Sequence, residues 1–324
     1  MTRTSSSLHG GQIANLPAIR AALLEWFAAS ARDLPWRRTR DPYRIMVSEI
    51  MLQQTQVDRV LPKYHAFIET FPTLEALAAA STAEIIRAWA GLGYNRRAVN
   101  MQRAARTVLD EHGGQFPRDM AALLKLPGIG PYTGGAIACF AFEQDVAFMD
   151  TNIRRVAQRL FAGPEDDTPT GEQKLLAIAA AAVPPGQAWA WNQAMIELGA
   201  LICTAAAPAC WRCPVRAQCQ AYAAWRSADE QIFGDAPAPE PSRRRRLAER
   251  REAPYAGSNR FFRGRAVEAL RRLPHDQALP LRELGLRIKA GFGDDDMPWL
   301  RSLVAGLARD GLLAIDGDTV RLPT

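Results

Sequence analysis

Four closely spaced cysteines constrain this chain more than any other feature. Cys203, Cys210, Cys213 and Cys219 give the spacing C-x6-C-x2-C-x5-C directly after a segment with a helical pattern, Asn192–Ile202. Thiolates so concentrated bind either a tetrahedral zinc ion or an iron–sulfur cluster. Structural zinc sites usually contain two short cysteine pairs, and this run contains one. The spacing therefore favours a 4Fe-4S cluster over zinc.

Composition narrows the class of protein. With 324 residues, of which 48% are hydrophobic, the chain is long enough for two or three domains. Its net charge of +6 favours a polyanionic partner. Only Cys139 lies outside the cysteine run, so no disulfide framework is expected. Met1–Gly11 does not resemble a signal peptide, and no run is long and apolar enough to span a bilayer. We expect a cytoplasmic protein.

Helical periodicity dominates from Pro17 to Tyr222, and strand-like alternation is nearly absent there. Three helix-start signals support an all-α fold for this region. Asp41-Pro42 combines an N-cap with proline at the first helical position. Ser81-x-x-Glu84 and Thr170-x-x-Gln173 have the sequence of capping boxes.

The last third of the chain has a different pattern. Asp235–Pro241 is rich in proline and indicates an extended linker, and the basic run Arg243–Arg246 is either a solvated tether or a phosphate-binding clamp. A small module begins at Asn259, with a tight-turn signal at Asp316-Gly317. Its expected elements are helices Arg263–Leu273, Leu281–Lys289 and Pro298–Asp310 and strands Leu312–Ile315 and Thr319–Leu322. This order predicts a winged helix, a fold that binds DNA or other proteins.

A glycine-rich turn lies between two helical stretches, in the sequence Leu126–Thr133. Gly128 and Gly130 permit backbone conformations that other residues avoid, and a helix is expected directly after them. Free amides at such a helix start can bind a phosphate without a side chain. The segment is either a helix-hairpin-helix motif that binds a DNA backbone or an ordinary helix–helix turn.

Two carboxylates are candidates for catalysis. Asp150 follows the apolar run Val146–Met149, where it is an N-cap or a functional carboxylate close to the backbone bound by the hairpin. Glu49 has the apolar neighbours Val47, Ile50 and Met51. If Glu49 is buried there, desolvation raises its pKa and suits it to general acid catalysis; otherwise it is a surface residue of an amphipathic helix.

Together, the hairpin, Asp150 and the four-cysteine loop resemble the endonuclease III superfamily of DNA glycosylases. Several segments most closely resemble the MutY-type adenine glycosylases, which remove adenine mispaired with 8-oxoguanine or guanine. These segments are Leu34-Pro35-Trp36-Arg37, Ser48 to Val57, Gly91-Leu92-Gly93-Tyr94 and Asp150-Thr151-Asn152. The resemblance covers roughly residues 16 to 225 and implies an all-α fold of two helical domains with the active site in the cleft between them.

The expected domains follow from this resemblance and from the composition. A six-helix barrel with the hairpin spans residues 36–145, and residues 16–35 and 146–225 form the domain that carries the cluster. A disordered amino terminus, 1–15, a linker, 226–257, and the winged-helix-like module, 258–324, complete the chain. The MutY family usually ends in a domain that resembles NUDIX hydrolases, and this tail does not. The resemblance therefore leaves selectivity for 8-oxoguanine over guanine open.

Roles for individual residues come from the resemblance. It implies that Glu49 protonates adenine at N7 and that Asp150 stabilises the positively charged sugar. Tyr132 stands where bifunctional relatives carry a lysine, so we expect a monofunctional glycosylase in which Tyr132 helps to hold the sugar cation.

The resemblance also assigns DNA and base contacts. Gln54, Thr55, Leu92 and Tyr94 are expected to insert into the duplex around the base opposite the adenine. Trp36, Arg37 and Glu197 are expected at the adenine pocket, and Gly128 and Gly130 at the DNA backbone. Leu34 and Leu52 are either pocket or core residues.

The expected partner is double-stranded DNA that contains an adenine mispair, and the protein is expected to be a monomer. Three other functions compete with this one. They are a thymine glycosylase for T opposite G, a non-catalytic DNA-binding lesion sensor, and a bifunctional lyase for oxidised pyrimidines. Glu49 with Gln53–Gln56 disfavours the first, the two carboxylates disfavour the second, and Tyr132 disfavours the third.

Overall fold

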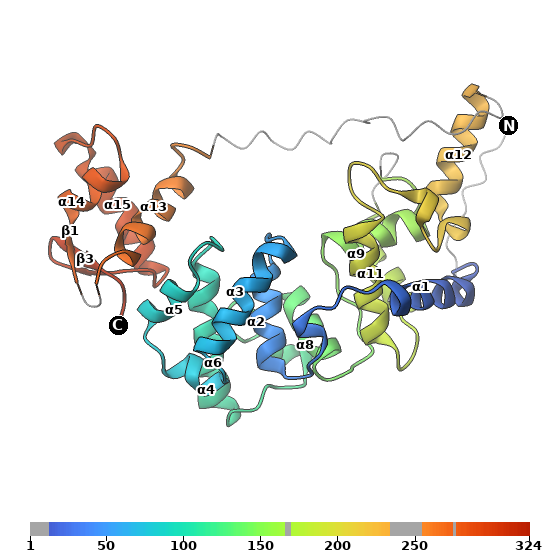
Figure 1. Cartoon of the computed structure of the whole chain (residues 1–324), viewed down its shortest axis with the longest axis horizontal. Helices are drawn as coiled ribbons and strands as arrows, with labels where there is room; N and C mark the ends of the chain where they lie inside the picture. Colours follow the sequence, from blue (N-terminus) through green and yellow to red (C-terminus); the bar gives the residue numbers. More distant parts are fainter. Residues whose placement is uncertain (1–12, 166–169, 234–254, 275–276) are drawn as a thin grey trace. The chain divides into compact units, whose positions relative to one another are not determined.

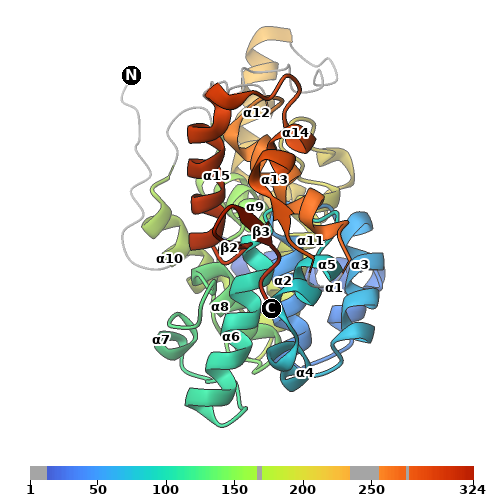
Figure 2. The same cartoon turned by 90° about the vertical axis from the view of Figure 1, so that its left-hand side faces the viewer.

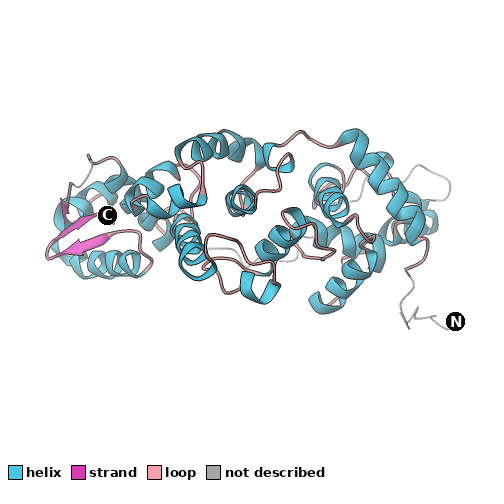
Figure 3. Ribbon diagram, turned by 90° about the horizontal axis from the view of Figure 1, so that it is seen from below, coloured by secondary structure: helices cyan, strands magenta, loops and turns pink. Residues whose placement is uncertain are grey.

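The computed structural model describes residues 13–165, 170–233, 255–274 and 277–324. Most of the predicted disordered amino terminus, the Asp235–Pro241 linker and the Arg243–Arg246 run lie outside the described residues. Within the described residues the chain is mostly helical, and its strands lie in the carboxy-terminal part (Figure 3). The predicted all-α fold with a small terminal sheet is confirmed. None of the described helices has both the length and the apolar composition that a bilayer span requires.

Contacts divide the chain into two units, residues 1–40 with 134–246 (unit 1) and residues 41–133 with 247–324 (unit 2). Unit 1 is built around α11 (Ala188–Leu201), which packs against α1 (Leu16–Ser30) and α9 (Thr151–Ala157) (Figure 1). Gly199 of α11 allows α9 to approach closely, because a Cβ atom there would lie 2.6 Å from Cβ of Asn152. The other elements of unit 1 are the 3-10 helix Pro35–Arg37, most of α8 (Pro131–Phe140), the π-helix Gln158–Ala162, α10 (Glu172–Ala182), the 3-10 helices Cys210–Arg212 and Arg216–Gln218, and α12 (Gln220–Phe233).

One of the three predicted helix starts is wrong. Helix α10 begins at Glu172, and its N-cap is Gly171, which has no side chain to accept a capping hydrogen bond. The amide N–H of Thr170 instead donates to Oε1 of Gln158 at 3.0 Å. Thr170 therefore serves a loop contact, and its predicted capping box does not form.

Unit 2 begins with α2 (Pro42–Leu52), which is buried along most of its length. The predicted N-cap is confirmed, since Asp41 accepts from the Tyr43 N–H at 2.9 Å. The capping box of α5 (Thr82–Ala88) is also confirmed, with Ser81 and Glu84 bonded reciprocally. The remaining helices of residues 41–133 are α3 (Val57–Thr70), α4 (Leu74–Ala79), α6 (Arg96–His112), α7 (Met120–Leu123) and the first residues of α8.

The carboxy-terminal module has the element order of a winged helix (Figure 2). It consists of helices α13 (Asn259–Arg271), α14 (Leu281–Ile288) and α15 (Met297–Arg309), the 3-10 helix Asp294–Asp296, and strands β1 (Leu279–Pro280), β2 (Ala314–Asp316) and β3 (Thr319–Arg321). The sheet is antiparallel in the order β1-β3-β2, and Val320 pairs with both Leu279 and Ile315. Gly317 has φ of 53° in the β2–β3 turn, as the Asp-Gly pair predicts.

This module shares a hydrophobic core with the helices of residues 41–133. Ala83 and Ile86 of α5 and Val99 of α6 are buried in one cluster with apolar residues of α13, α14 and α15. The Ala83 N–H also donates to the carbonyl of Pro323 at 2.9 Å. The sequence predicted the module but not this contact.

Candidate active site

A buried carboxyl and a phenol form the central polar contact of unit 2. Glu49 lies on α2 and is only 3% exposed. Tyr132, the second residue of α8, donates its hydroxyl to Oε2 of Glu49 at 2.6 Å. Removal from water makes a hydrogen-bonded pair of this kind electrostatically strong and well positioned. Glu49 thus has the burial that its predicted role requires.

The predicted hairpin lies between α7 and α8. Gly128 has φ of 79°, a conformation that favours glycine. A Cβ atom at this position would also lie 2.8 Å from Cβ of Asn100, so a side chain does not fit without rearrangement. Gly130 directly precedes α8 and has open space around it. The turn leaves the amides at the start of α8 near Gly130, which is the arrangement that phosphate binding uses.

Two exposed loop residues adopt left-handed backbone conformations. Gln54 has φ of 56° and Tyr94 has φ of 45°, and the Tyr94 side chain is 50% exposed. Positive φ is uncommon for residues other than glycine, asparagine and aspartate, and it persists where the surroundings fix the backbone. Leu92 is buried and Thr55 is partly buried. The structure therefore presents Gln54 and Tyr94 outward, as the prediction of DNA contacts requires.

Arg97 of α6 fixes both loops, and the sequence did not point to it. Its guanidinium donates to the carbonyls of Ile50 and Gln53 at 2.7 and 2.6 Å, and to those of Leu92 and Gly93 at 3.1 and 3.3 Å. Burial lowers the pKa of Arg97 to about 10, so it stays charged at neutral pH. One cation thus ties the end of α2 to the loop that carries Tyr94.

Replacing Arg97 with lysine is expected to loosen both loops. The smaller ammonium cannot reach all of these carbonyls, so we expect a loss of about 2–4 kcal/mol in the free energy of unfolding. Urea titration measures this loss. Arg96→Lys is the matched control, because Arg96 is the exposed neighbour on the same helix. An equal and small loss in both variants would contradict the proposed role of Arg97.

Asp150 is the N-cap of α9 in unit 1. Its Oδ1 accepts from the Ile153 N–H at 2.6 Å, and its Oδ2 accepts from Nδ2 of Asn152 at 2.9 Å. Burial raises the pKa of Asp150, and these hydrogen bonds oppose the shift. The capping interpretation is therefore confirmed. The same two hydrogen bonds fix the orientation of the Asp150 carboxylate, whose charged form is disfavoured by burial.

A hydrogen-bonded chain links Asp150 to the cysteine loop. Asn152, which donates to Asp150, accepts at its Oδ1 from Nη2 of Arg155 at 2.8 Å. The same guanidinium donates through Nε to the carbonyl of Cys203 at 2.7 Å and through Nη2 to that of Gly199 at 2.7 Å. The position of the Asp150 carboxylate thus depends on the loop that begins at Cys203.

The predicted pocket residues Arg37 and Glu197 are bonded to each other. Both oxygens of Glu197 are engaged, Oε1 by Arg32 at 2.9 Å and Oε2 by Arg32 at 2.7 Å and Arg37 at 2.9 Å. Burial alone would raise the pKa of Glu197, but the hydrogen bonds from Arg32 and Arg37 lower it to about 2. Trp36 and Leu34 beside them are buried. Any contact between Glu197 and a base would be additional to this buried ion pair.

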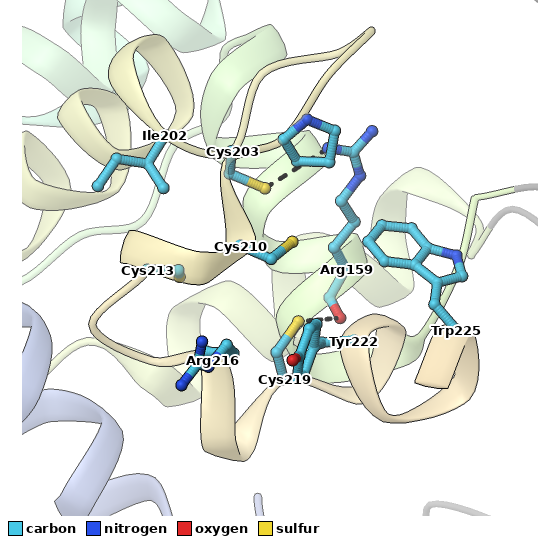
Figure 4. Close-up of a pocket in the computed structure, with 10 residues that line it drawn as sticks. Arg159, Ile202, Cys203, Cys210, Cys213, Arg216, Cys219, Tyr222 and Trp225 are labelled. Atoms are coloured by element: carbon cyan, nitrogen blue, oxygen red, sulfur yellow. Dashed lines mark hydrogen bonds between the residues drawn. The ribbon is translucent and has the colours of Figure 1, made fainter. Parts of the chain in front are cut away.

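The four cysteines line one cavity of unit 1 (Figure 4). Trp225, Tyr222 and Ile202 contribute to its walls. Nη1 of Arg159 lies 3.6 Å from Sγ of Cys203 and donates to it, and the thiol of Cys219 donates to the carbonyl of Arg159 at 3.3 Å. Among the described residues, no three His, Cys, Asp or Glu side chains are placed to hold a single metal ion.

Burial raises the pKa of the Cys213 thiol to about 12 and that of Cys219 to about 11, and it also raises the pKa of Cys210. By themselves these partly buried thiols are neutral at pH 7. A cationic iron centre reverses this preference, because coordination stabilises the thiolate. Four sulfurs around one shielded cavity, with the Arg159 cation beside them, therefore fit an anionic sulfur-ligated cluster.

Comparison with known proteins identifies the family. A family model described as "HhH-GPD superfamily base excision DNA repair protein" matches residues 47–180. An adenine DNA glycosylase of Mycolicibacterium smegmatis is 43% identical over 250 residues, which cover 77% of this chain and 79% of that protein. The chain belongs to the adenine DNA glycosylase family. The predicted resemblance is confirmed.

A second relative and two solved structures are also similar to this chain. The human adenine DNA glycosylase is 42% identical over 219 residues, which cover 64% of this chain and 40% of that protein. A thermostable thymine-DNA glycosylase matches with a TM-score of 0.60 and 32% identity over 64% of this chain and 97% of its own. A trapped endonuclease III–DNA covalent intermediate matches with a TM-score of 0.54 and 25% identity over 65% and 98% of the two chains.

Sequence reasoning found the family's motifs but missed their partners. The sequence analysis assigns Tyr132 a role because it stands where bifunctional relatives carry a lysine. It does not predict the contact with Glu49. No motif marked Arg97, Arg155 and Arg159, because each joins a neighbouring segment to one that is more than 40 residues away in the sequence.

Proposed function

We propose that this protein is a monofunctional adenine DNA glycosylase of base excision repair, which hydrolyses the N-glycosidic bond of adenine mispaired with 8-oxoguanine or guanine. The observation that carries the proposal is the hydrogen bond from Tyr132 to the buried Glu49 in a chain 43% identical to an adenine DNA glycosylase. A carboxyl removed from water is well suited to donate a proton to a bound base.

Protonation is the step that adenine removal needs most. Adenine leaves poorly as an anion, so a proton delivered to N7 allows the glycosidic electron pair to move onto the base as the bond breaks. Glu49 supplies this proton in the proposed mechanism, and Tyr132 orients its carboxyl through the 2.6 Å hydrogen bond. Adenine must first leave the base stack, which costs a few kcal/mol and costs least for a mispaired base.

Asp150 has the complementary role. Departure of the base leaves positive charge on the deoxyribose, and a carboxylate stabilises such a cation as in glycoside hydrolysis. Water then adds to C1′ and releases its proton to solvent, leaving an abasic site. The hydrogen bonds from Ile153 and Asn152 orient the Asp150 carboxylate for this task.

Strand cleavage is not part of the proposed activity. It requires an amine that forms a Schiff base with the sugar, and a phenol such as Tyr132 cannot form one. The hairpin at Gly128 and Gly130 binds the DNA backbone in this proposal. Gln54, Thr55 and Tyr94 contact the duplex around the opposite base, and Leu92, which is buried, supports the Tyr94 loop and does not insert as predicted. Trp36, Arg37 and Glu197 line or support the adenine pocket.

Cys203, Cys210, Cys213 and Cys219 hold a 4Fe-4S cluster in this proposal. When bound, the cluster supplies a rigid cross-link for the loop that begins at Cys203. Through Arg155 and Asn152 this loop orients Asp150.

Elemental analysis tests the cluster. Purified protein is expected to contain about four iron atoms and about four acid-labile sulfides per chain, as a 4Fe-4S cluster requires. Cys213→Ala should lose this content, whereas Cys139→Ala, which changes the cysteine outside the run, should keep it. One zinc and no sulfide per chain would establish the zinc alternative instead.

A panel of duplexes tests the activity. The protein is incubated with A opposite 8-oxoguanine, A opposite G, T opposite G, and thymine glycol, and abasic sites are then cleaved with alkali. Product is expected from both adenine mispairs, and little is expected when alkali is omitted. The ratio of the two adenine rates gives the selectivity for 8-oxoguanine.

Each alternative has its own result in this panel. The structural match to a thymine-DNA glycosylase favours T opposite G as the second candidate substrate. Product from that duplex alone would replace the adenine proposal with it. Cleavage without alkali would indicate a lyase, and binding without any product would indicate a lesion sensor.

A further inference from the structure

The carboxy-terminal module is fixed to α5 and α6 by polar contacts as well as by the shared core. Arg271 of α13 donates through Nε to the carbonyl of Ile86 at 3.0 Å and through Nη2 to Oδ1 of Asn95 at 3.1 Å. Asn95 directly follows Tyr94. The position of α13 is therefore set relative to the loop that carries Tyr94.

The helix that usually enters the DNA groove in winged-helix proteins is poorly placed to do so here. Helix α15 is preceded by Asp294, Asp295 and Asp296, a segment that offers no cation to phosphate. Arg282 and Lys289, the nearby cations, are paired with two of these carboxylates. Its other end is packed against α6, where a Cβ atom at Gly311 would lie 2.7 Å from Nη2 of Arg103. An interface with DNA must therefore use another surface of this module.

The start of α13 carries basic and aromatic side chains next to Tyr94. Nη1 of Arg260 donates to the hydroxyl of Tyr94 at 3.2 Å, and the same guanidinium lies 5.2 Å from the ring centroid of Tyr255. Tyr255 contacts Phe261 edge to face, and Arg265 lies 5.5 Å from the centroid of the Phe261 ring. Tyr255 is 54% exposed, and Arg260 and Arg265 are exposed as well.

We propose that this surface of α13, formed by Tyr255, Arg260 and Arg265, binds the DNA phosphate backbone beside the base pair that Tyr94 contacts. The inference rests on the proposed function only in taking the Tyr94 loop as part of the DNA interface. Aromatic rings hold the two guanidinium groups in position, and such pre-oriented groups bind phosphate through paired hydrogen bonds. The module thus extends the DNA interface and contributes affinity without contacting the adenine.

DNA binding measured against salt concentration tests this surface. Arg260→Ala and Arg265→Ala are compared with Arg272→Ala, which removes an equal charge from the C-cap of the same helix. Arg272 is exposed and bonded to Glu268, and it lies at the other end of α13. Fluorescence anisotropy with a fully paired duplex and with an A-opposite-G duplex, in an Asp150→Asn background, gives affinities without turnover.

Arg260→Ala is expected to weaken binding of both duplexes about fivefold to tenfold, and to reduce the slope of log affinity against log salt by about one. Arg265→Ala should have a similar effect, and Arg272→Ala should change affinity less than about twofold. Circular dichroism melts should show unchanged folding for all three.

Two results would overturn the proposal. Equal affinities and slopes for all three variants would exclude α13 from the interface. An unchanged slope for Arg260→Ala, with an affinity loss matched by Tyr94→Phe and no further loss in the double variant, would show that Arg260 only orients Tyr94. Neither result depends on which base is removed, so failure of the adenine assay is a separate outcome.

Discussion

Asp150→Asn is expected to lower the single-turnover rate of adenine release by about a thousandfold or more while leaving the fold intact. Asparagine keeps the shape and the capping ability of aspartate but carries no charge to stabilise the sugar cation. It can still accept from the Ile153 N–H that Asp150 binds at 2.6 Å. The loss should therefore appear in the chemical step and not in DNA binding.

The same substitution should have two opposing effects on thermal stability, because it removes a buried charge but also loses the hydrogen bond that Oδ2 of Asp150 accepts from Nδ2 of Asn152. Burial raises the pKa of Asp150 above its usual value, so the folded protein favours the neutral acid. The stabilisation from this neutral form is complete below the unfolded-state pKa and is lost as the pH rises through the folded-state pKa. At neutral pH the charged carboxylate is therefore a cost, which asparagine removes.

A pH profile follows from the same shift. The proposed mechanism requires charged Asp150, so the rate should fall as the pH drops through its raised pKa. The acid limb should then lie above the usual aspartate range near 3.8.

Asp119→Asn is the matched control for the Asp150→Asn substitution, since Asp119 is the exposed N-cap of α7. Normal activity in Asp150→Asn would exclude the proposed role of this carboxylate.

Glu49→Gln is expected to lower adenine release by about a hundredfold to ten thousandfold, the usual contribution of a general acid. Glutamine has nearly the same volume and can still accept the Tyr132 hydroxyl, but it has no acidic proton to give. Tyr132→Phe removes only the orienting hydrogen bond, so its loss should be smaller.

DNA binding by the Glu49→Gln and Tyr132→Phe variants separates a loss of catalysis from a loss of affinity. Both variants should bind the A-opposite-G duplex with affinities close to that of the unmodified protein, because neither changes the DNA backbone contacts. Glu69→Gln, an exposed position on α3, serves as the control. A Tyr132→Phe loss as large as that of Glu49→Gln would indicate that proton transfer needs the phenol as much as the carboxyl, and no loss in Glu49→Gln would exclude Glu49 as the acid.

Local patterns predicted the local structure well. Asp41, Ser81 and the glycines of the hairpin act on neighbours within a few residues, so the sequence alone contains their partners. The Thr170 capping box failed for a related reason, since the distant Gln158 side chain took the Thr170 N–H. A capping pattern shows which hydrogen bond is possible but not which competitor is near.

Contacts between distant segments were not predictable in this way. Helical periodicity indicates which face of α2 is buried, but it does not indicate that Tyr132, 83 residues away, meets Glu49. Arg37 and Glu197 are 160 residues apart. The family resemblance placed these residues in one functional region, yet their hydrogen bonds came from the fold.

The shared core of α5, α6 and the last three helices determines what a carboxy-terminal truncation would expose. A fragment that stops before residue 255 would leave Ile86 and Val99 without the apolar cover that they have in the whole chain. Newly uncovered hydrophobic area of this kind promotes self-association. The carboxy-terminal module is therefore needed to keep the enzyme soluble. A fragment without it is expected to precipitate even though it retains every proposed catalytic residue.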